Sequence, residues 1–166
     1  MKALGEILCD WDGKSVDFMN EVRSRFENQH NYIDDLLLLC CSTETEVAAS
    51  WLLKAAFEDG LEFEPEQSDR LIATGIGFVH WEAQLHLCQS LRYLSITDES
   101  AESLRDWLSE MLRHKRPFLR AWSLDGVVHL AKQSVAFEKP ARVALANAEQ
   151  DPAASVRARA RNLKSV

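Results

Sequence analysis

The sequence contains no long apolar segment. Its longest dense apolar stretch runs from Leu36 to Cys41, whereas a membrane-spanning helix needs roughly 18 consecutive apolar residues. The first residues, from Met1 to Asp12, also lack the basic segment, apolar region and cleavage site of a signal peptide. We therefore expect no membrane segment and a cytoplasmic location.

Patterns typical of a metal or redox site are also missing. No CxxC pair occurs, and no Cys–His spacing is typical of zinc. The best metal-like group is His80, Glu82 and His86, but the two histidines are six residues apart and point to different sides of a helix. We predict no metal and no cofactor, and we interpret the cysteines as buried free thiols. They are Cys9, Cys40, Cys41 and Cys88.

Catalytic motifs are equally scarce. Neither GxSxG nor a Walker-type loop occurs, and Gly75-Ile76-Gly77 lacks the strand and third glycine of a dinucleotide-binding loop. We interpret this segment as a helix end or a place of close packing. Ser123, Asp125 and His129 are the residue types of a hydrolase triad. Ser123, however, falls on the inward face of a predicted helix, so packing is its expected role.

Charge is distributed unevenly along the chain. Residues 1–110 hold 8 Lys+Arg and 22 Asp+Glu, a net charge of −14, whereas residues 111–166 hold 11 and 4, a net charge of +7. The whole chain has a net charge of −7. We therefore expect one acidic end and one basic end.

The apolar pattern recurs every 36 or 37 residues in two series. Each residue of the first series begins an apolar run. The residues four and eight positions after it share its helical face. The first series is Val47, Ala83, Leu119 and Val156. The second series is Leu36, Ile72, Leu108 and Ala144, with Leu71, Trp107 and Val143 beside its last three members. Two series with one interval predict four pairs of helices, the second series marking the first helix of each pair.

Helix boundary signals agree with this pattern. Thr97 to Ser100 resembles a helix N-terminus before the run 101–113, and Pro117 suits the opening of the next helix. Asp151 is a candidate cap for a helix over 152–163, and residues 15–26 have the spacing of an N-terminal capping helix. No convincing alternating strand exists, since the best candidate, 5–11, is short.

The segment from Asp151 to Ala160 resembles the HEAT-repeat family, in which an Asp is followed by Val-Arg and a small residue. Other pairs depart from the pattern: His114 stands at the Asp position, and Ala48 and Gln84 at the Arg position. The resemblance implies an all-α, right-handed α-α superhelix of about four HEAT-like or armadillo-like pairs. Residues 1–166 would form one domain, with an N-terminal segment and capping helix over 1–29 and repeats of about 36 residues over 30–166. The family also implies polar ladders and a concave side lined by second helices.

Seven residues are candidates for contacting a partner. Arg157 and Arg161 are four apart and share a face, and Arg120 has the position of Arg157 one repeat earlier, so we expect them side by side. We expect Trp51 and Trp107 in the core, and Trp81 and Trp122 as candidate anchors. The predicted site is Arg113, Arg116, Arg120, Arg157, Arg161, Trp81 and Trp122.

These features favour a non-catalytic scaffold for a protein partner. An alternative is a nucleic-acid-binding protein similar to the HEAT-like DNA glycosylases that excise alkylated bases. The basic repeats favour that alternative, the net charge of −7 opposes it, and the family's catalytic residues find no match in this sequence. A third hypothesis, an enzyme such as the bilin lyases with helical repeats, has no specific residue in its support.

Overall fold

A computed structural model describes residues 3–164, and these residues form helices and loops without a strand. Helices follow one another closely along the chain. They are α1 (Leu4–Leu8), α2 (Val16–Phe26), α3 (Tyr32–Leu39), α4 (Glu46–Glu58), α5 (Pro65–Gly75), α6 (Trp81–Ser90), α7 (Asp98–Met111), α8 (Pro117–Gln133), α9 (Glu138–Ala148) and α10 (Ala154–Lys164). Two 3₁₀ turns, η1 (Leu91–Tyr93) and η2 (Val135–Phe137), follow α6 and α8. No described helix is long and apolar enough to cross a membrane.

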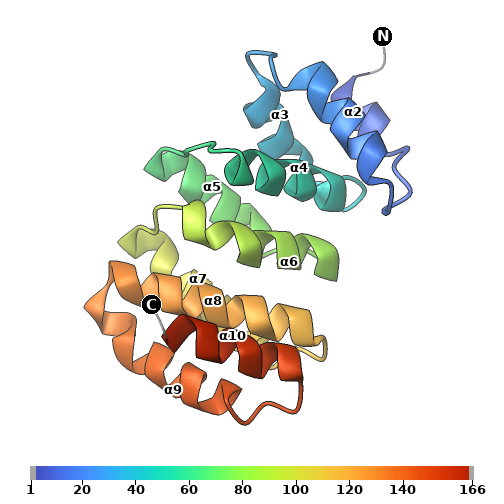
Figure 1. The fold of residues 1–166 in the computed structure, drawn as a ribbon. Helices are drawn as coiled ribbons and strands as arrows, with labels where there is room; N and C mark the ends of the chain where they lie inside the picture. Colours follow the sequence, from blue (N-terminus) through green and yellow to red (C-terminus); the bar gives the residue numbers. More distant parts are fainter. Residues whose placement is uncertain (1–2, 165–166) are drawn as a thin grey trace.

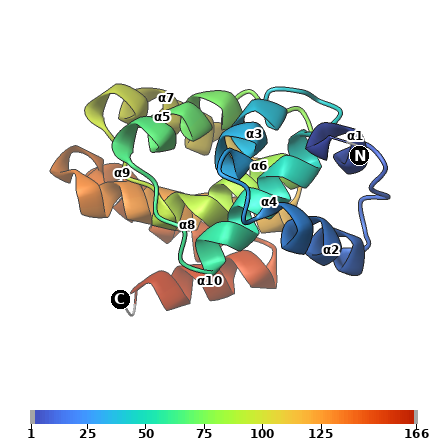
Figure 2. The same cartoon turned by 90° about the horizontal axis from the view of Figure 1, so that it is seen from above.

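The helices pack in two layers. In Figure 1, α4, α6, α8 and α10 lie one after another, and each packs against the next. Figure 2 shows α3, α5 and α7 together behind them. Within the chain, α3 packs on α4, α5 on α6 and α7 on α8, whereas α9 packs against both α8 and α10. Successive pairs therefore bury their apolar faces against neighbours on both sides.

Local sequence explains several helix ends. The side chain of Ser15 accepts a hydrogen bond from the backbone N–H of Phe18 at 3.2 Å, and Thr97 caps Ser100 in the same way. Pro65 and Pro117 occupy the first positions of α5 and α8, as their fixed φ allows. Gly75 ends α5, where an added Cβ would lie 2.6 Å from Leu87 Cδ2, so both roles expected for the 75–77 segment are confirmed.

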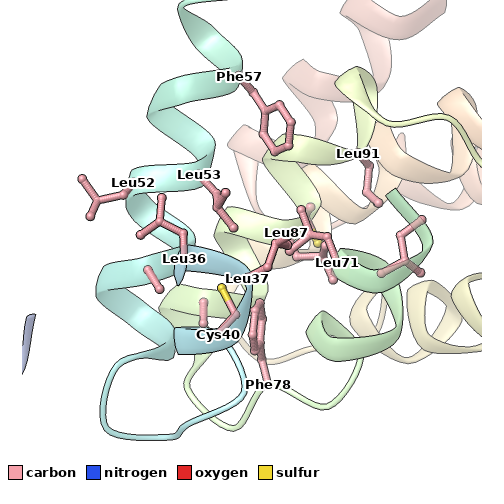
Figure 3. Close-up of a cluster of buried hydrophobic side chains, with 14 of the residues drawn as sticks. Leu36, Leu37, Cys40, Leu52, Leu53, Phe57, Leu71, Phe78, Leu87 and Leu91 are labelled. Carbon is pink, nitrogen blue, oxygen red and sulfur yellow. The ribbon is translucent and has the colours of Figure 1, made fainter. Parts of the chain in front are cut away.

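Most of the core is one large apolar cluster that runs from α1 to α9. Figure 3 shows its centre, where Leu36, Leu53, Leu71 and Leu87 point into the space between α3, α4, α5 and α6. A second, small cluster joins α8, α9 and α10. It consists of Ala121, Leu124, Ala148, Val156 and Ala160.

The members of both series are buried or partly buried, and two other positions depart from expectation. Ala83, Leu119 and Val156 are buried and Val47 is partly buried, while Leu36, Ile72 and Leu108 are fully buried and Ala144 partly so. Val143 is the first departure: it is 53% exposed, although Leu71 and Trp107 at the equivalent positions are buried. Trp51 is the second, since it is only partly buried against the core, whereas Trp107 is buried as expected.

Residues 3–164 hold no strand, as the sequence indicated, whereas the interpretation of all the cysteines as buried was wrong. Residues 5–11 hold no strand, because Leu4, Ile7 and Leu8 bury one face of the short helix α1. The cysteines are free, as expected, but only Cys40 and Cys88 are buried. Cys9 follows the end of α1 and Cys41 lies two residues after the end of α3, and both are exposed.

Candidate partner-binding surface

Trp81 opens α6, and its ring lies beneath a guanidinium from the next pair. Arg116, the residue that precedes α8, places its guanidinium carbon 3.9 Å from the Trp81 ring centroid. The indole is partly buried against the core and the arginine is exposed. Such a cation–π contact contributes roughly 0.5–1 kcal/mol at an exposed site. It also holds the guanidinium at the surface, where its N–H groups remain available to a partner.

Trp122 lies on α8 between guanidiniums from the helices on either side. The guanidinium carbon of Arg92, in η1, is 5.2 Å from the ring centroid, and that of Arg159, in α10, is 3.8 Å away. Both arginines donate to Asp125 Oδ1, at 2.9 and 3.3 Å. Arg92, Trp122, Asp125 and Arg159 are called the Trp122 cluster below. It links three neighbouring helical segments through a carboxylate whose side chain is 7% exposed.

Arg120 and Arg157 meet at Asp151, as expected from their equivalent positions. Arg120 donates two hydrogen bonds of 2.8 Å to the Asp151 carboxylate, and Arg157 Nη1 donates to the Asp151 carbonyl at 2.6 Å. Hydrogen bonds from Arg120 hold the pKa of Asp151 below its usual value and raise the pKa of Arg120 itself. These two arginines therefore connect loops within the chain. Their role in a partner site remains a prediction.

Arg113 and Arg161 complete the predicted set, and both side chains are exposed. Arg161 lies on α10 with Arg157 one turn before it. Arg113 follows α7 and lines a cavity of about 520 Å³ that Arg120 also lines. The structure thus brings Arg120 and Arg157 together and stacks Arg116 on Trp81. Arg113 and Arg161 are not members of the Trp122 cluster.

Sequence analysis missed the roles of Arg92, Asp125 and Arg159. The interval itself carried a signal for one of them, because Arg159 stands 37 residues after Trp122, as Val156 stands 37 after Leu119. The same series contains Ser50 and His86, 36 residues apart, whose Oγ and Nδ1 atoms lie 3.0 Å from each other. Residues at one interval therefore contact each other across neighbouring helices.

Candidate catalytic side chains are engaged in packing. Ser123 is fully buried and donates to the Leu119 carbonyl, Asp125 binds arginines, and His129 contacts the Leu94 carbonyl. Burial also lowers the pKa of His129. These contacts do not assemble the hydrolase arrangement, in which the histidine must bridge the other two residues.

The histidines near α6 likewise join helices. His80 Nδ1 lies 2.8 Å from Glu46 Oε1, which also accepts the backbone N–H groups of Val79 and His80. His86 contacts Ser50, and burial lowers its pKa to about 3. Within residues 3–164, no group of three His, Cys, Asp or Glu side chains is placed to hold a metal ion.

Comparison with family models, curated proteins and solved structures finds no match to this chain. The candidate surface therefore has to be judged by its own chemistry. That chemistry consists of cations held against aromatic rings along α6, α8 and α10.

Proposed function

We propose that the chain is a non-catalytic binding scaffold that acts in the cytoplasm. In this proposal the surface of α6, α8 and α10 binds an acidic segment of a protein partner. One observation carries the proposal: Arg116 stacks on Trp81, and Arg92 and Arg159 flank Trp122 on neighbouring helices. Arginine and tryptophan are enriched among residues that dominate binding energy. A guanidinium on an indole still offers N–H donors to carboxylates.

The proposed architecture is a right-handed superhelix of about four HEAT-like pairs, with α2 as the N-terminal cap. Its support is a hydrogen bond that recurs in three pairs. Gln84, Arg120 and Arg157 stand 36 and 37 residues apart, and each donates to the carbonyl six residues before it. The accepting carbonyls are those of Phe78, His114 and Asp151, at 2.8, 2.8 and 2.6 Å. Stacked pairs of this kind present extended surfaces to partners.

Charge favours an acidic partner at this end of the molecule. Residues 111–166, which include α8 and α10, have a net charge of +7, and the preceding residues have a net charge of −14. An acidic segment would be attracted to the C-terminal helices and repelled by the N-terminal ones. Such complementarity mainly sets orientation and association rate.

Charge reversal on the proposed surface tests this function. Tagged protein would capture partners from an extract of its source cells, and the affinity for each purified partner would then be measured. We expect the Arg116→Glu, Arg161→Glu double variant to bind at least about tenfold more weakly, because both side chains are exposed and each reversal adds repulsion. Arg142→Glu is the matched control, since Arg142 is exposed on α9 at the same basic end. Equal affinity of the double variant and the wild type would contradict the proposal.

Nucleic-acid binding is the second candidate, and the same arginine–tryptophan contacts favour it. Cations bind phosphates and indoles stack on bases, as in proteins that bind single strands. The net charge of −7 opposes this function, because phosphate contacts dominate such affinity. We expect no gel shift of duplex or single-stranded DNA at low salt. A shift that the Arg116→Glu, Arg161→Glu variant abolishes would replace the protein partner by a nucleic acid.

A further inference from the structure

Val143 lines a cavity that is a second candidate binding site. It occupies the position of Leu71 and Trp107 at the 36-residue interval, but those two side chains are buried and Val143 is 53% exposed. It lines the cavity of about 520 Å³ introduced above, which is called the α7–α9 cavity below. Most of the lining comes from α9 and from the end of α7 with the residues that follow it. The apolar surface left exposed at Val143 thus forms one wall of a cavity that is partly open to solvent.

The lining combines an apolar body with a cationic rim. Leu112, Pro140 and Val143 contribute apolar surface, and Arg113, Arg120 and Lys139 contribute positive charge. Asp151 is the one carboxylate of the lining within the described chain, and Arg120 pairs with it. Arg113 and Lys139 are exposed, and neither side chain has a carboxylate partner among residues 3–164. The cavity therefore has two unneutralised cations beside an apolar wall.

From this geometry we propose that the α7–α9 cavity binds a small amphiphilic carboxylate, an organic acid with one anionic head and an apolar tail. Arg113 and Lys139 bind the head, and the wall formed by Leu112, Pro140 and Val143 covers the tail. The volume is within the range of roughly 300–1,000 Å³ that small-molecule sites occupy. A cationic amphiphile is excluded by the charge of the rim. A neutral one loses the charge-assisted hydrogen bonds that hold the head.

This site goes beyond the proposed partner surface, with which it shares the predicted residues Arg113 and Arg120. None of its lining residues belongs to the Trp122 cluster, and neither Trp81 nor Arg116 lines it. A ligand in the cavity would contact residues from two adjacent pairs. Leu112 and Arg113 follow α7 of one pair, and Val143 belongs to α9 of the next. Bound ligand would therefore join the last helix pair to the one before it.

Titration with three amphiphiles of equal chain length tests the proposal. Decanoate, decanol and decyltrimethylammonium would be added to the full chain, with calorimetry for affinity and amide NMR shifts for location. We expect saturable decanoate binding below about 1 mM, at least about tenfold tighter than decanol, because a charged hydrogen bond contributes that much. Shifts should gather at residues 109–113 and 139–148, and decyltrimethylammonium should not bind there.

Variants separate the cationic rim from the rest of the surface. We expect Arg113→Gln and Lys139→Gln each to weaken decanoate binding roughly tenfold, and decanol binding to stay unchanged. Arg142→Gln, a neighbouring exposed change on α9 outside the cavity, should leave both affinities as they are. Both rim residues are exposed, so the fold should tolerate the changes. Absence of saturable decanoate binding, shifts located elsewhere, or equal effects of the rim and control variants would overturn the proposal.

Discussion

The two ends of the helix stack are held by different forces. Between α3 and α6 the core is built from large side chains such as Leu36, Leu53 and Phe57, each at most 1% exposed. At the other end, α9 and α10 share a small cluster with α8 in which three of five buried members are alanine. Alanine buries little apolar surface, so this end gains less from the hydrophobic effect.

Ion pairs supply part of what the C-terminal core lacks. Arg120 binds Asp151, Arg159 binds Asp125, and Lys164 binds Glu149 at 2.5 Å. Such pairs depend on geometry and salt, whereas apolar burial does not depend on direction. We therefore expect α9 and α10 to open before the rest of the chain. That is a property expected of a region that adapts to a ligand or partner.

The largest expected effect separates the two cores. Leu53→Ala should lower the free energy of unfolding by about 2–5 kcal/mol, because it leaves a cavity among large side chains. Val156→Ala in the C-terminal cluster should cost about 1–2 kcal/mol, because fewer carbons are lost. Urea denaturation followed by circular dichroism measures both values. Equal losses in the two variants would remove the distinction between the ends.

The helical class and much of the core were predictable from the sequence. Leu36, Ile72 and Leu108 recur at one interval and are all fully buried, because a constant interval returns each residue to the same face of its helix. Thr97 caps α7, and Pro117 opens α8, as expected from their local chemistry.

Other features depend on tertiary placement that no local pattern contains. Helix α1 has five residues and is too short to show helical periodicity, so the sequence did not predict it. The exposure of Val143 depends on where α9 lies relative to α7. The contact of Asp125 with Arg92 and Arg159 depends on the rotation of three helical segments. Spacing identified Arg120 and Arg157 as neighbours, but it did not reveal that both bind Asp151.

Removal of the Asp125 carboxylate tests the ion pairs of the C-terminal end. Asp125→Asn should lower the free energy of unfolding by about 1–3 kcal/mol, because it leaves two arginines without their shared carboxylate. This range lies below that for a fully buried pair, since the Arg92 and Arg159 side chains are 39% and 24% exposed. Glu138→Gln, which removes an exposed partner of Arg142, should change stability by less than about 0.5 kcal/mol. An Asp125 variant as stable as this control would show that the ion pairs of Asp125 do not help to hold α10.

The pH dependence of the free energy of unfolding should also differ between the ends. At the apolar end it depends on His86, which contacts Ser50 of α4. Burial lowers its pKa to about 3, so the unfolded chain binds the proton more readily than the folded chain does. Stability is therefore highest above the ordinary His pKa of about 6.5 and falls as pH decreases from there toward 3. We expect a loss of about 1–2 kcal/mol between pH 7 and pH 5.

Substitution of His86, compared with a control histidine, tests whether His86 causes the loss of stability between pH 7 and pH 5. His86→Gln keeps a polar partner for Ser50 but cannot take up a proton, so its stability should change less over the same pH range. The exposed residue His30 offers the matched control, and His30→Gln should retain the wild-type dependence. Identical pH profiles for His86→Gln and the wild type would contradict the assignment.

The smallest expected effect belongs to Asp151, at the opposite end of the stack. Its pKa is lowered, chiefly by hydrogen bonds from Arg120, so its contribution to stability is fully present above the ordinary Asp pKa of about 3.9. That contribution is lost only as pH falls through the lowered value. Between pH 7 and pH 5 the Asp151 carboxylate stays charged, so this pair should cause no additional opening of α10. Amide exchange in α10 should then slow with decreasing pH as much as the intrinsic exchange rate does. Below about pH 4 we expect α10 to open more often, so that its amide exchange becomes faster relative to the intrinsic rate at the same pH.

Arg120→Gln should remove this acid-dependent step, because the carboxylate then loses the partner that favours its charged form. The change would also weaken the junction of α8 with the loop before α10 at neutral pH. If exchange in α10 instead accelerates between pH 7 and pH 5, in step with the titration of His86, the two ends unfold as one unit. The division into an apolar end and an ion-paired end would then describe composition without describing how the chain opens.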